Sequence, residues 1–373
     1  MKLLFASRKT LAPLGEGGGE TIAFDLLSAL ESRGLMGVKA LGAFHYPQLE
    51  ALGGILRDLR VNLSLEQQAA EIETGEGTIA YPAFAHVTYR MPDSPTTTLA
   101  REDHFQQSFA EYLRQYNPDV ALLQAEGFIE CWRELRERRD VRTFFYVQNG
   151  YEPARFKDLG IGTPRLLANS EFVKRKVKDQ FGYDSDVLYP AIQAERYHGE
   201  NPAKSGQFTV LFVNPIAVKG LAIFLHLADR FPSVQFLALE GWSKIEGKIF
   251  QMLSSRPNIT CLPKTWNMAQ IYAVANLLVA PSQWQEAFGR VVVEAHAAGV
   301  PTLASRVGGL PEASGAAGLL VDDYANPSAW ETALREIVNQ PAILETRRPL
   351  LEGNARRFNP DLAAQRFAEL AAS

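Results

Sequence analysis

Two glutamates with seven residues between them, Glu286 and Glu294, are the side chains in this sequence best suited to chemistry. Glu286 falls in a predicted loop after a strand, and Glu294 falls about one turn into a predicted helix of small and apolar residues. Such a helix is buried, so a carboxylate on it needs a partner. A ribose diol offers two donors, in bonds of about 1.5–3 kcal/mol. A buried salt bridge is the alternative, and for two glutamates alone it is the stronger interpretation.

The residues between the two glutamates would serve an anionic ligand. Gly289 lets a ligand approach the backbone closely, because it has no side chain. The amides of residues 289–292 open the predicted helix, where unsatisfied donors and the helix dipole favour a diphosphate. Glu286, which precedes this helix, would then reach a sugar hydroxyl.

A second loop with a charge lies at residues 213–220, between a predicted strand and a predicted helix. Its Lys219 would fall in the first helical turn, where the helix dipole disfavours a cation. A bound anion would offset that penalty. A solvated lysine is the alternative, because the penalty is only a few tenths of a kcal/mol.

A glycine-rich loop at residues 15–20 follows the first predicted strand and opens a helix. The bare amides of Gly17 and Gly18 would suit a phosphate. The dinucleotide-binding fingerprint does not fit, since Glu20 stands where the third glycine belongs. A flexible turn is the alternative interpretation.

Five other polar residues are candidates for a functional site. Glu126 follows a predicted strand, so its loop is expected at the ligand-binding end of the sheet and could contact an acceptor. His104 sits in a predicted helix, where a structural role is more common than a catalytic one. Asp184 and Asp186 resemble a metal-binding pair but read better as a turn. His296 faces away from Glu294 and is expected to be packed.

The candidate residues must be positioned by strands and helices. The chain alternates short apolar runs with amphipathic stretches. Predicted strands lie at 3–6, 38–41, 120–123, 143–147, 166–168, 209–213, 234–239, 258–262, 277–280, 301–304 and 318–321. Predicted helices lie at 21–32, 99–116, 128–137, 219–230, 291–299 and 360–371. The alternation predicts an α/β fold with two doubly wound, Rossmann-like units that face a cleft. The units are expected at 1–188, completed by a helix at 359–373, and at 189–358. No prediction is made for residues 53–95.

Composition excludes several classes of protein. The 373 residues carry 38 Lys and Arg against 42 Asp and Glu, so the net charge of −4 excludes a strongly basic nucleic-acid binder. Two cysteines 130 positions apart form no disulfide framework, and a reducing cytoplasm is the default expectation. No apolar run approaches 18 residues, so no membrane span is expected, although peripheral attachment stays open.

The stretch at 281–301 resembles the donor-site motif of the retaining family 4 glycosyltransferases, which have the GT-B fold. That family carries a Glu-x7-Glu pair within a pattern like Pro-Ser…Glu-x-Phe-Gly…Glu-Ala-x-Ala-x-Gly-x-Pro-Val. The resemblance continues through 304–312 and 318–321. It also covers the glycine loop, the Lys219-Gly220 loop, 168–173 and the interdomain segment 188–192. Because these matches run in order over most of the chain, they are more specific than any one motif.

The resemblance implies transfer of a sugar from a nucleoside diphosphate sugar, with retention of configuration and with neither metal nor cofactor. It implies that Glu294 holds the ribose, Glu286 contacts the donor sugar and Lys219 neutralises the diphosphate. Gly17 and Gly18 would close on the phosphates. Further donor-site residues that it implies are Asn214, Phe288, Gly289, Arg290 and Val291.

Two departures from the family pattern affect the expected chemistry. Asn214 stands where the family has a phosphate-binding arginine, and Arg290, Arg306 or Arg8 is expected to compensate. The family's histidine after the fifth strand is also missing.

Gln148 and Asn149 occupy that loop, where they would bond the acceptor or the sugar without acting as a base. A sugar-nucleotide epimerase and an idle sugar-nucleotide binder remain alternatives. Trp242 and Lys264 mark the loops that would contact the nucleotide base. The sequence identifies neither the base nor the acceptor.

Overall fold

A computed structural model describes residues 1–9, 18–44, 62–74, 77–90, 95–199, 206–241, 243–265 and 267–373. The described chain divides into two compact units. Unit 1 comprises Met1–Asn169, Lys174–Ala191 and Pro360–Ser373, and unit 2 comprises Ser170–Val173 and Ile192–Asn359. The main division thus falls three residues after the predicted boundary at 188/189, and residues 170–173 group with unit 2.

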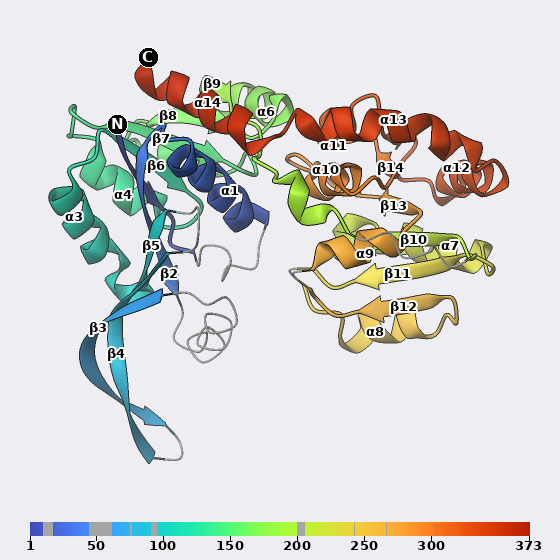
Figure 1. Cartoon of the computed structure of the whole chain (residues 1–373), viewed down its shortest axis with the longest axis horizontal. Helices are drawn as coiled ribbons and strands as arrows, with labels where there is room; N and C mark the ends of the chain where they lie inside the picture. Colours follow the sequence, from blue (N-terminus) through green and yellow to red (C-terminus); the bar gives the residue numbers. More distant parts are fainter. Residues whose placement is uncertain are drawn as a thin grey trace. The chain divides into compact units, whose positions relative to one another are not determined.

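Unit 1 is built on a mostly parallel sheet in the order β3-β4-β5-β2-β1-β6-β7-β8-β9. Its strands are β1 (Lys2–Ala6), β2 (Gly37–Phe44), β3 (Asn62–Thr74), β4 (Gly77–Arg90), β5 (Thr96–Arg101), β6 (Val120–Gln124), β7 (Arg142–Val147), β8 (Arg165–Ala168) and β9 (Ser185–Val187). The antiparallel pairs join β4 to β3 and to β5. The long β3–β4 hairpin extends from the sheet, as Figure 1 shows.

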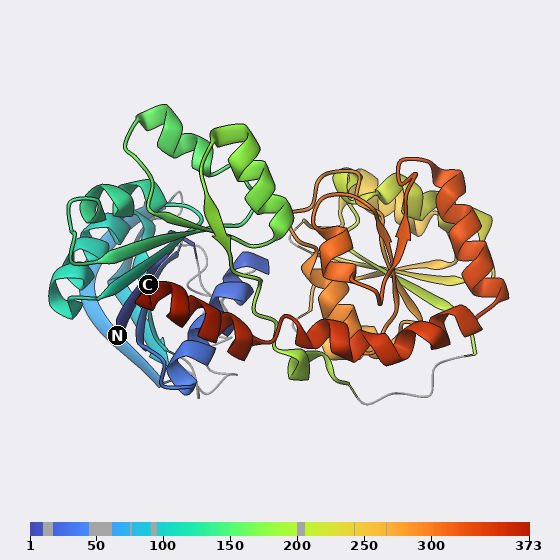
Figure 2. The same ribbon diagram turned by 90° about the horizontal axis from the view of Figure 1, so that it is seen from above.

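Helices cover both faces of this sheet. They are α1 (Gly18–Ser32), α3 (Phe105–Tyr116), α4 (Phe128–Leu135), α5 (Pro153–Leu159), α6 (Glu171–Phe181) and α14 (Pro360–Ala372). Alternate strand residues such as Leu3, Phe5 and Leu122 form one core with α1 and α14, which lie side by side (Figure 2). Phe144 and Phe367 join α14 to β7, with ring centroids 5.4 Å apart.

The predicted helix at 99–116 is wrong in its first part. Thr96, Thr97 and Thr98 open β5, which pairs in parallel with β2, and a short 3-10 turn at Glu102–His104 follows. The α-helix begins only at Phe105. β-branched threonines favour a strand, and here pairing along β2 prevails over the helical spacing of the apolar residues further on.

Unit 2 is built on a parallel sheet in the order β12-β11-β10-β13-β14-β15. Its strands are β10 (Thr209–Val213), β11 (Gln235–Leu239), β12 (Ile259–Leu262), β13 (Leu277–Ala280), β14 (Thr302–Ser305) and β15 (Leu319–Val321). The strand order reverses between β10 and β13. In such sheets, ligands bind outside the carboxyl ends of the strands at this switch point.

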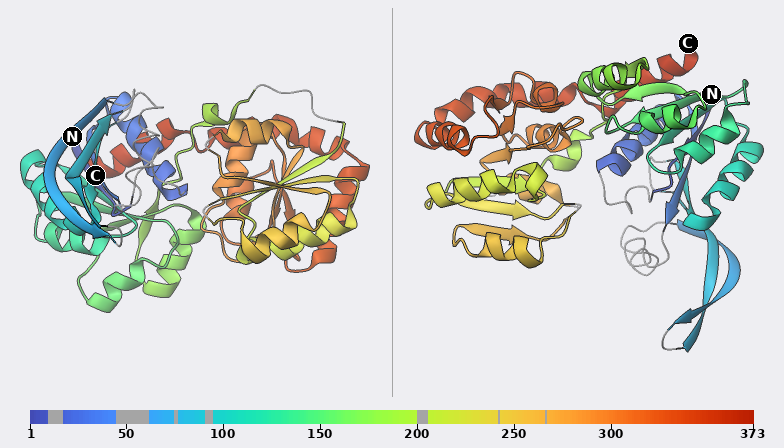
Figure 3. Two further views of the ribbon diagram at one scale, coloured as in Figure 1. Left: turned by 90° about the horizontal axis from the view of Figure 1, so that it is seen from below. Right: turned by 180° about the vertical axis from the view of Figure 1, so that it is seen from behind.

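The helices of unit 2 are α7 (Leu221–Arg230), α8 (Gly247–Ser254), α9 (Met268–Val274), α10 (Arg290–Ala297), α11 (Leu310–Ser314), α12 (Pro327–Asn339) and α13 (Ala342–Arg356). Helices lie on both sides of the sheet (Figure 3). Val210 and Phe212 share a core with α7 and α12, whereas α10 packs on β13, β14 and α13. The predicted α/β class with two doubly wound units is confirmed. Within the described residues, no helix combines the length and apolar character needed to cross a bilayer.

His296 is packed inside unit 2, as the sequence predicts. The side chain is 1% exposed. Its Nδ1 accepts a hydrogen bond from Asn354 at 2.8 Å, so its Nε2 is the protonated nitrogen and donates to Thr302 Oγ1 at 2.9 Å. These bonds tie α10 to α13 and β14. Burial lowers the pKa of this imidazole to about 3.

This burial predicts an acid-sensitive unit 2. The folded chain leaves His296 neutral until about pH 3, whereas an unfolded histidine takes up a proton near pH 6.5. The unfolded state therefore binds the extra proton between these values, and stability falls as the pH falls through that window. We expect a loss of about 2 kcal/mol between pH 8 and pH 5 from this group. Urea unfolding at both pH values measures it. His296→Gln should remove this part of the pH dependence of stability. An unchanged pH dependence in that variant would contradict the role given to His296.

Candidate functional site

The two loops at the switch point of unit 2 bring Lys219 and Glu286 together. Lys219 Nζ lies 2.5 Å from Glu286 Oε1, and both side chains are largely buried, at 21% and 12% exposed. The Ser282 hydroxyl donates to the same carboxylate oxygen. Lys219 belongs to a short 3-10 turn, Ala217–Lys219, and not to the first turn of α7 as predicted. An anion arriving here would compete with Glu286 for the ammonium group.

Two glycines allow the loops around this pair to pack closely. A Cβ on Gly220 would lie 2.0 Å from the Pro281 carbonyl oxygen, so only glycine lets the loop of Lys219 pack this closely on the loop of Glu286. A Cβ on Gly308 would lie 2.3 Å from the Glu286 carbonyl oxygen. The neighbouring Gly309 N–H donates to that oxygen at 2.7 Å. The position of Glu286 therefore depends on a turn some twenty residues further along the chain.

Glu294 already has partners inside the protein. Its side chain lies on α10, with Oε1 2.5 Å from Arg290 Nε and Oε2 accepting from the Tyr272 hydroxyl at 3.1 Å. The residue is 7% exposed. The buried salt bridge that the sequence left as an alternative is thus present. It does not exclude a ribose, because a carboxylate accepts about four hydrogen bonds, whereas here Tyr272 donates one and Arg290 forms an ion pair with the other oxygen.

Residues 288–292, at the start of α10, include both packing residues and amides that could bind a ligand. Gly289 has a φ of +106°, and a Cβ there would lie 2.6 Å from Leu310 Cδ2, so this position requires glycine. The Val292 N–H donates to the Gly289 carbonyl at 3.0 Å, which removes one of the four amides predicted for a diphosphate. The amides of Gly289, Arg290 and Val291 stay candidates. Phe288 is buried and packs on Phe358, with centroids 4.9 Å apart, and its contact with the donor stays a prediction.

Asn214 follows β10 in the left-handed conformation, with a φ of +61°. Its backbone N–H donates to Leu239 O at 2.8 Å, and its Oδ1 accepts from Ser243 N at 3.3 Å. Its Nδ2 is buried and has no hydrogen-bond partner among the described residues. A donor is therefore left over at the place where the resembling family has an arginine.

The three arginines expected to compensate all face carboxylates. Arg290 pairs with Glu294, Arg306 with Asp322, and Arg8 in unit 1 lies 3.8 Å from Glu102. Their compensation for the missing arginine stays a prediction.

In unit 1, the start of α1 rests on two glutamine side chains. Gln124, the last residue of β6, donates from Nε2 to the Gly19 carbonyl at 3.0 Å, and Gln148 after β7 donates to the same oxygen at 3.5 Å. A Cβ on Gly19 would lie 2.4 Å from Gln148 Oε1. Gly18 is the first residue of α1, and the predicted phosphate contact at Gly17 falls outside the described residues.

The loop after β7 contains a carboxyl group, Glu152, that the sequence motifs do not single out. Asn149 accepts at Oδ1 from Tyr151 N at 2.8 Å, so its side chain closes a local turn. Its own N–H donates to Glu152 Oε2 at 3.4 Å. Burial raises the pKa of the Glu152 carboxyl. Its position between a strand end and α5 was the available signal, because such loops lie at the ligand-binding edge of the sheet.

The two remaining candidates in unit 1 are Glu126 and His104, and each contacts other groups of unit 1. Glu126 is 60% exposed at its side chain and lies 3.9 Å from Lys9. His104 falls in the 3-10 turn before α3 and not in the predicted helix, and its carbonyl accepts from Ser108.

The two aspartates of the metal-like pair each face a cation. Asp184 lies 2.8 Å from Lys178, and Asp186, in β9, lies 2.9 Å from Arg165. Of the two residues named for the nucleotide base, Lys264 lies in the loop after β12, and Trp242 falls outside the described residues.

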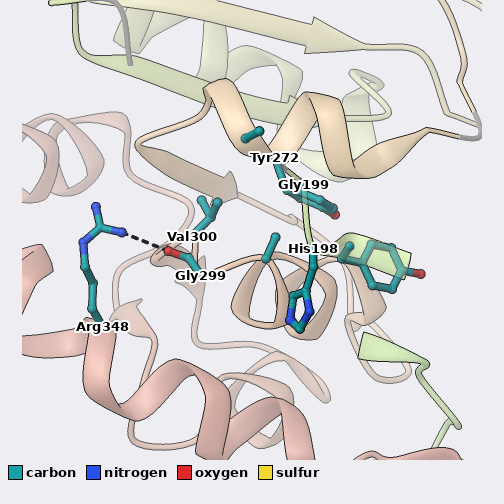
Figure 4. Close-up of a pocket in the computed structure, with 9 residues that line it drawn as sticks. His198, Gly199, Tyr272, Gly299, Val300 and Arg348 are labelled. Atoms are coloured by element: carbon teal, nitrogen blue, oxygen red, sulfur yellow. Dashed lines mark hydrogen bonds between the residues drawn. The ribbon is translucent and has the colours of Figure 1, made fainter. Parts of the chain in front are cut away.

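A separate pocket of about 300 Å³ lies in unit 2 near the carboxyl end of α10. It is lined by Tyr197, His198, Gly199, Tyr272, Ala273, Ala298, Gly299, Val300 and Arg348. Arg348 reaches from α13 and donates to the Gly299 carbonyl at 3.0 Å (Figure 4). No sequence pattern indicates this pocket, since its lining comes from four separate segments.

Comparison with known proteins decides the family of unit 2. A family model described as glycosyl transferases group 1 matches residues 193–357. Residues 193–357 are a group 1 glycosyltransferase domain. This domain contains both the Lys219–Glu286 and the Arg290–Glu294 pairs, so the predicted donor-site motif lies inside the matched family region.

Two curated relatives of this chain share one description. The D-inositol 3-phosphate glycosyltransferase of Rhodococcus opacus is 38% identical over 209 residues, which is 48% of this chain and 46% of that protein. Its counterpart in Streptomyces coelicolor is 37% identical over 252 residues, which is 55% of this chain and 54% of that protein. The matched part of the chain therefore spans about half the length of these relatives.

Solved structures show the fold of the whole chain. Anabaena HepE in complex with UDP and glucose has a TM-score of 0.72 at 16% identity, with 100% of both chains covered. Sucrose-phosphate synthase from Thermosynechococcus elongatus has a TM-score of 0.74 at 17% identity, again with full coverage of both chains. The predicted GT-B type of fold, with the group 1 domain as its second unit, is confirmed.

Proposed function

We propose that this protein transfers a sugar from a nucleoside diphosphate sugar to an acceptor, with retention of anomeric configuration and without a metal. The observation that carries the proposal is the Lys219–Glu286 pair at the switch point of a group 1 glycosyltransferase domain. An ammonium group and nearby helix-start amides suit the charge that develops on a leaving diphosphate. Glu286 and Ser282 beside them provide acceptors and a donor for sugar hydroxyls.

The donor and the acceptor are proposed from chemistry and from the relatives. The HepE structure contains UDP and glucose, and the curated relatives are named for D-inositol 3-phosphate. UDP-glucose and D-inositol 3-phosphate are therefore the first donor and acceptor to test. The loop after β7 has no histidine at the place where the family carries one, and it offers Gln148 and Asn149 as hydrogen-bonding groups instead. The leaving phosphate itself would accept the proton of the attacking hydroxyl, and the C–O bond to the acceptor forms as the C–O bond to the phosphate breaks.

A donor screen followed by a turnover assay tests this function. Thermal shifts with UDP, GDP and ADP, and then with their glucose conjugates, identify the nucleotide, because a ligand that binds the folded state raises its stability. NMR of the product then reports the anomeric configuration, and EDTA tests the need for a metal. We expect slow donor hydrolysis alone, faster nucleotide release with an acceptor, retained configuration and no effect of EDTA. Binding without any turnover would instead indicate an idle sugar-nucleotide binder, and a changed sugar released without acceptor would indicate an epimerase.

A further inference from the structure

Two tyrosines extend the Arg290–Glu294 pair into a four-membered network within unit 2. Arg290 donates from Nη2 to the Tyr197 hydroxyl at 2.8 Å, and the Tyr272 hydroxyl donates to Glu294 Oε2 at 3.1 Å. The two tyrosine rings pack edge to face, with centroids 6.0 Å apart. Tyr197 comes from the 3-10 turn Ala194–Tyr197, Tyr272 from α9, and Arg290 and Glu294 from α10, so the network joins three separate elements.

The network holds each oxygen of Glu294 from a different side. Arg290 is bound to Oε1 and Tyr272 to Oε2, so rotation of the carboxylate would break at least one of these contacts. Tyr272 is fully buried, and burial raises its pKa well above the ordinary value, which keeps the phenol protonated as a donor. Tyr197 is 6% exposed. The lone pairs that stay open on Glu294 are thereby fixed in direction.

We propose that Tyr197 and Tyr272 are positioning residues that aim Glu294 at the ribose and so make the site select ribonucleotides over deoxyribonucleotides. This inference rests on the proposed function, since it assumes that Glu294 binds a nucleotide's sugar. The two hydroxyls of a ribose need two acceptor directions at once. A fixed carboxylate offers both, whereas a freely rotating one would bind a deoxyribose, with its single hydroxyl, nearly as well as a ribose. The orientation of Glu294 therefore affects the preference for ribose over deoxyribose more strongly than it affects the affinity for either nucleotide.

Hydroxyl-deletion variants test this directly. UDP, GDP and ADP are titrated against the wild-type protein by calorimetry, and the tightest binder is compared with its 2′-deoxy form. We expect wild type to prefer the ribonucleotide about tenfold or more. Tyr272→Phe should reduce that preference about three- to tenfold, because it removes one hydrogen bond to the carboxylate. Tyr197→Phe should reduce it less, because it acts through Arg290. With the donor sugar, KM should rise while kcat changes less than threefold.

A matched control separates positioning from stability. Tyr146→Phe also removes a buried hydroxyl, one that donates to the Leu188 carbonyl at 2.9 Å in unit 1, and it should leave the nucleotide preference unchanged. Equal weakening of both nucleotides in Tyr272→Phe would overturn the inference and leave a structural role alone. If Tyr272→Phe does not fold, Tyr197→Phe carries the test with the same criterion. A wild-type protein that binds none of the three nucleotides would overturn the proposed function as well, whereas wild-type binding with unchanged ratios in both variants overturns this inference alone.

Discussion

Replacing Lys219 with methionine is expected to lower kcat about 10²–10³-fold with the donor that the protein uses. The ammonium group lies at the switch point, 2.5 Å from Glu286, where the diphosphate of a donor would arrive. Methionine keeps the length of the side chain and removes the charge. The effect should fall on kcat, because the charge on the leaving group increases as the bond to the sugar breaks. Steady-state kinetics with saturating donor measures it.

Two further variants separate catalysis from a local charge imbalance. Lys248→Met removes an exposed cation from α8 of the same unit and should leave kcat unchanged. Lys219→Met also leaves Glu286 without its cation, which could itself disturb the loop. The double variant Lys219→Met/Glu286→Gln removes that imbalance and should stay as slow as the single one. Recovery of activity in the double variant, or a loss of less than threefold in the single one, would contradict a catalytic role for Lys219.

The sequence was most informative where one short stretch determines the structure. The apolar runs at 209–213 and 277–280 are β10 and β13, because buried parallel strands read as continuous apolar segments. Lys219 and Glu286 follow these strands closely, so the topology alone brings them to one edge of the sheet. Their shared position at this edge is what the strand order of a doubly wound unit requires.

The sequence was least informative where a contact joins distant segments. The sequence allows either a ribose or a buried salt bridge at Glu294 but does not identify the partners that the structure shows. Arg290 lies one turn earlier, and Tyr272 lies 22 residues away on α9. A tyrosine in an amphipathic stretch gives no sign of where its hydroxyl will point. The same limit applies to Gly308, whose contact with Glu286 depends on the packing of two loops.

Replacing Glu294 with alanine is expected to have two separable effects. Loss of the carboxylate should weaken nucleotide binding by about 1.5–3 kcal/mol, if the open lone pairs bind the ribose. It also leaves the guanidinium of Arg290 without its partner, at a site where both side chains are about nine-tenths buried. Breaking a buried pair from one side typically costs about 3–5 kcal/mol of stability. Calorimetric titration measures the first effect and urea unfolding the second.

The variant Arg290→Leu/Glu294→Leu distinguishes the two roles of this carboxylate. Replacing both members of a buried ion pair with apolar groups is often close to neutral for stability, so the double variant should regain most of the stability that Glu294→Ala loses. It should not regain nucleotide affinity, because leucine offers no acceptor to a ribose. Full nucleotide affinity in the double variant would mean that Glu294 only maintains the packing of α10, and the ribose would have to be bound elsewhere. Persistent weak binding in a stable double variant would instead separate recognition from folding at this residue.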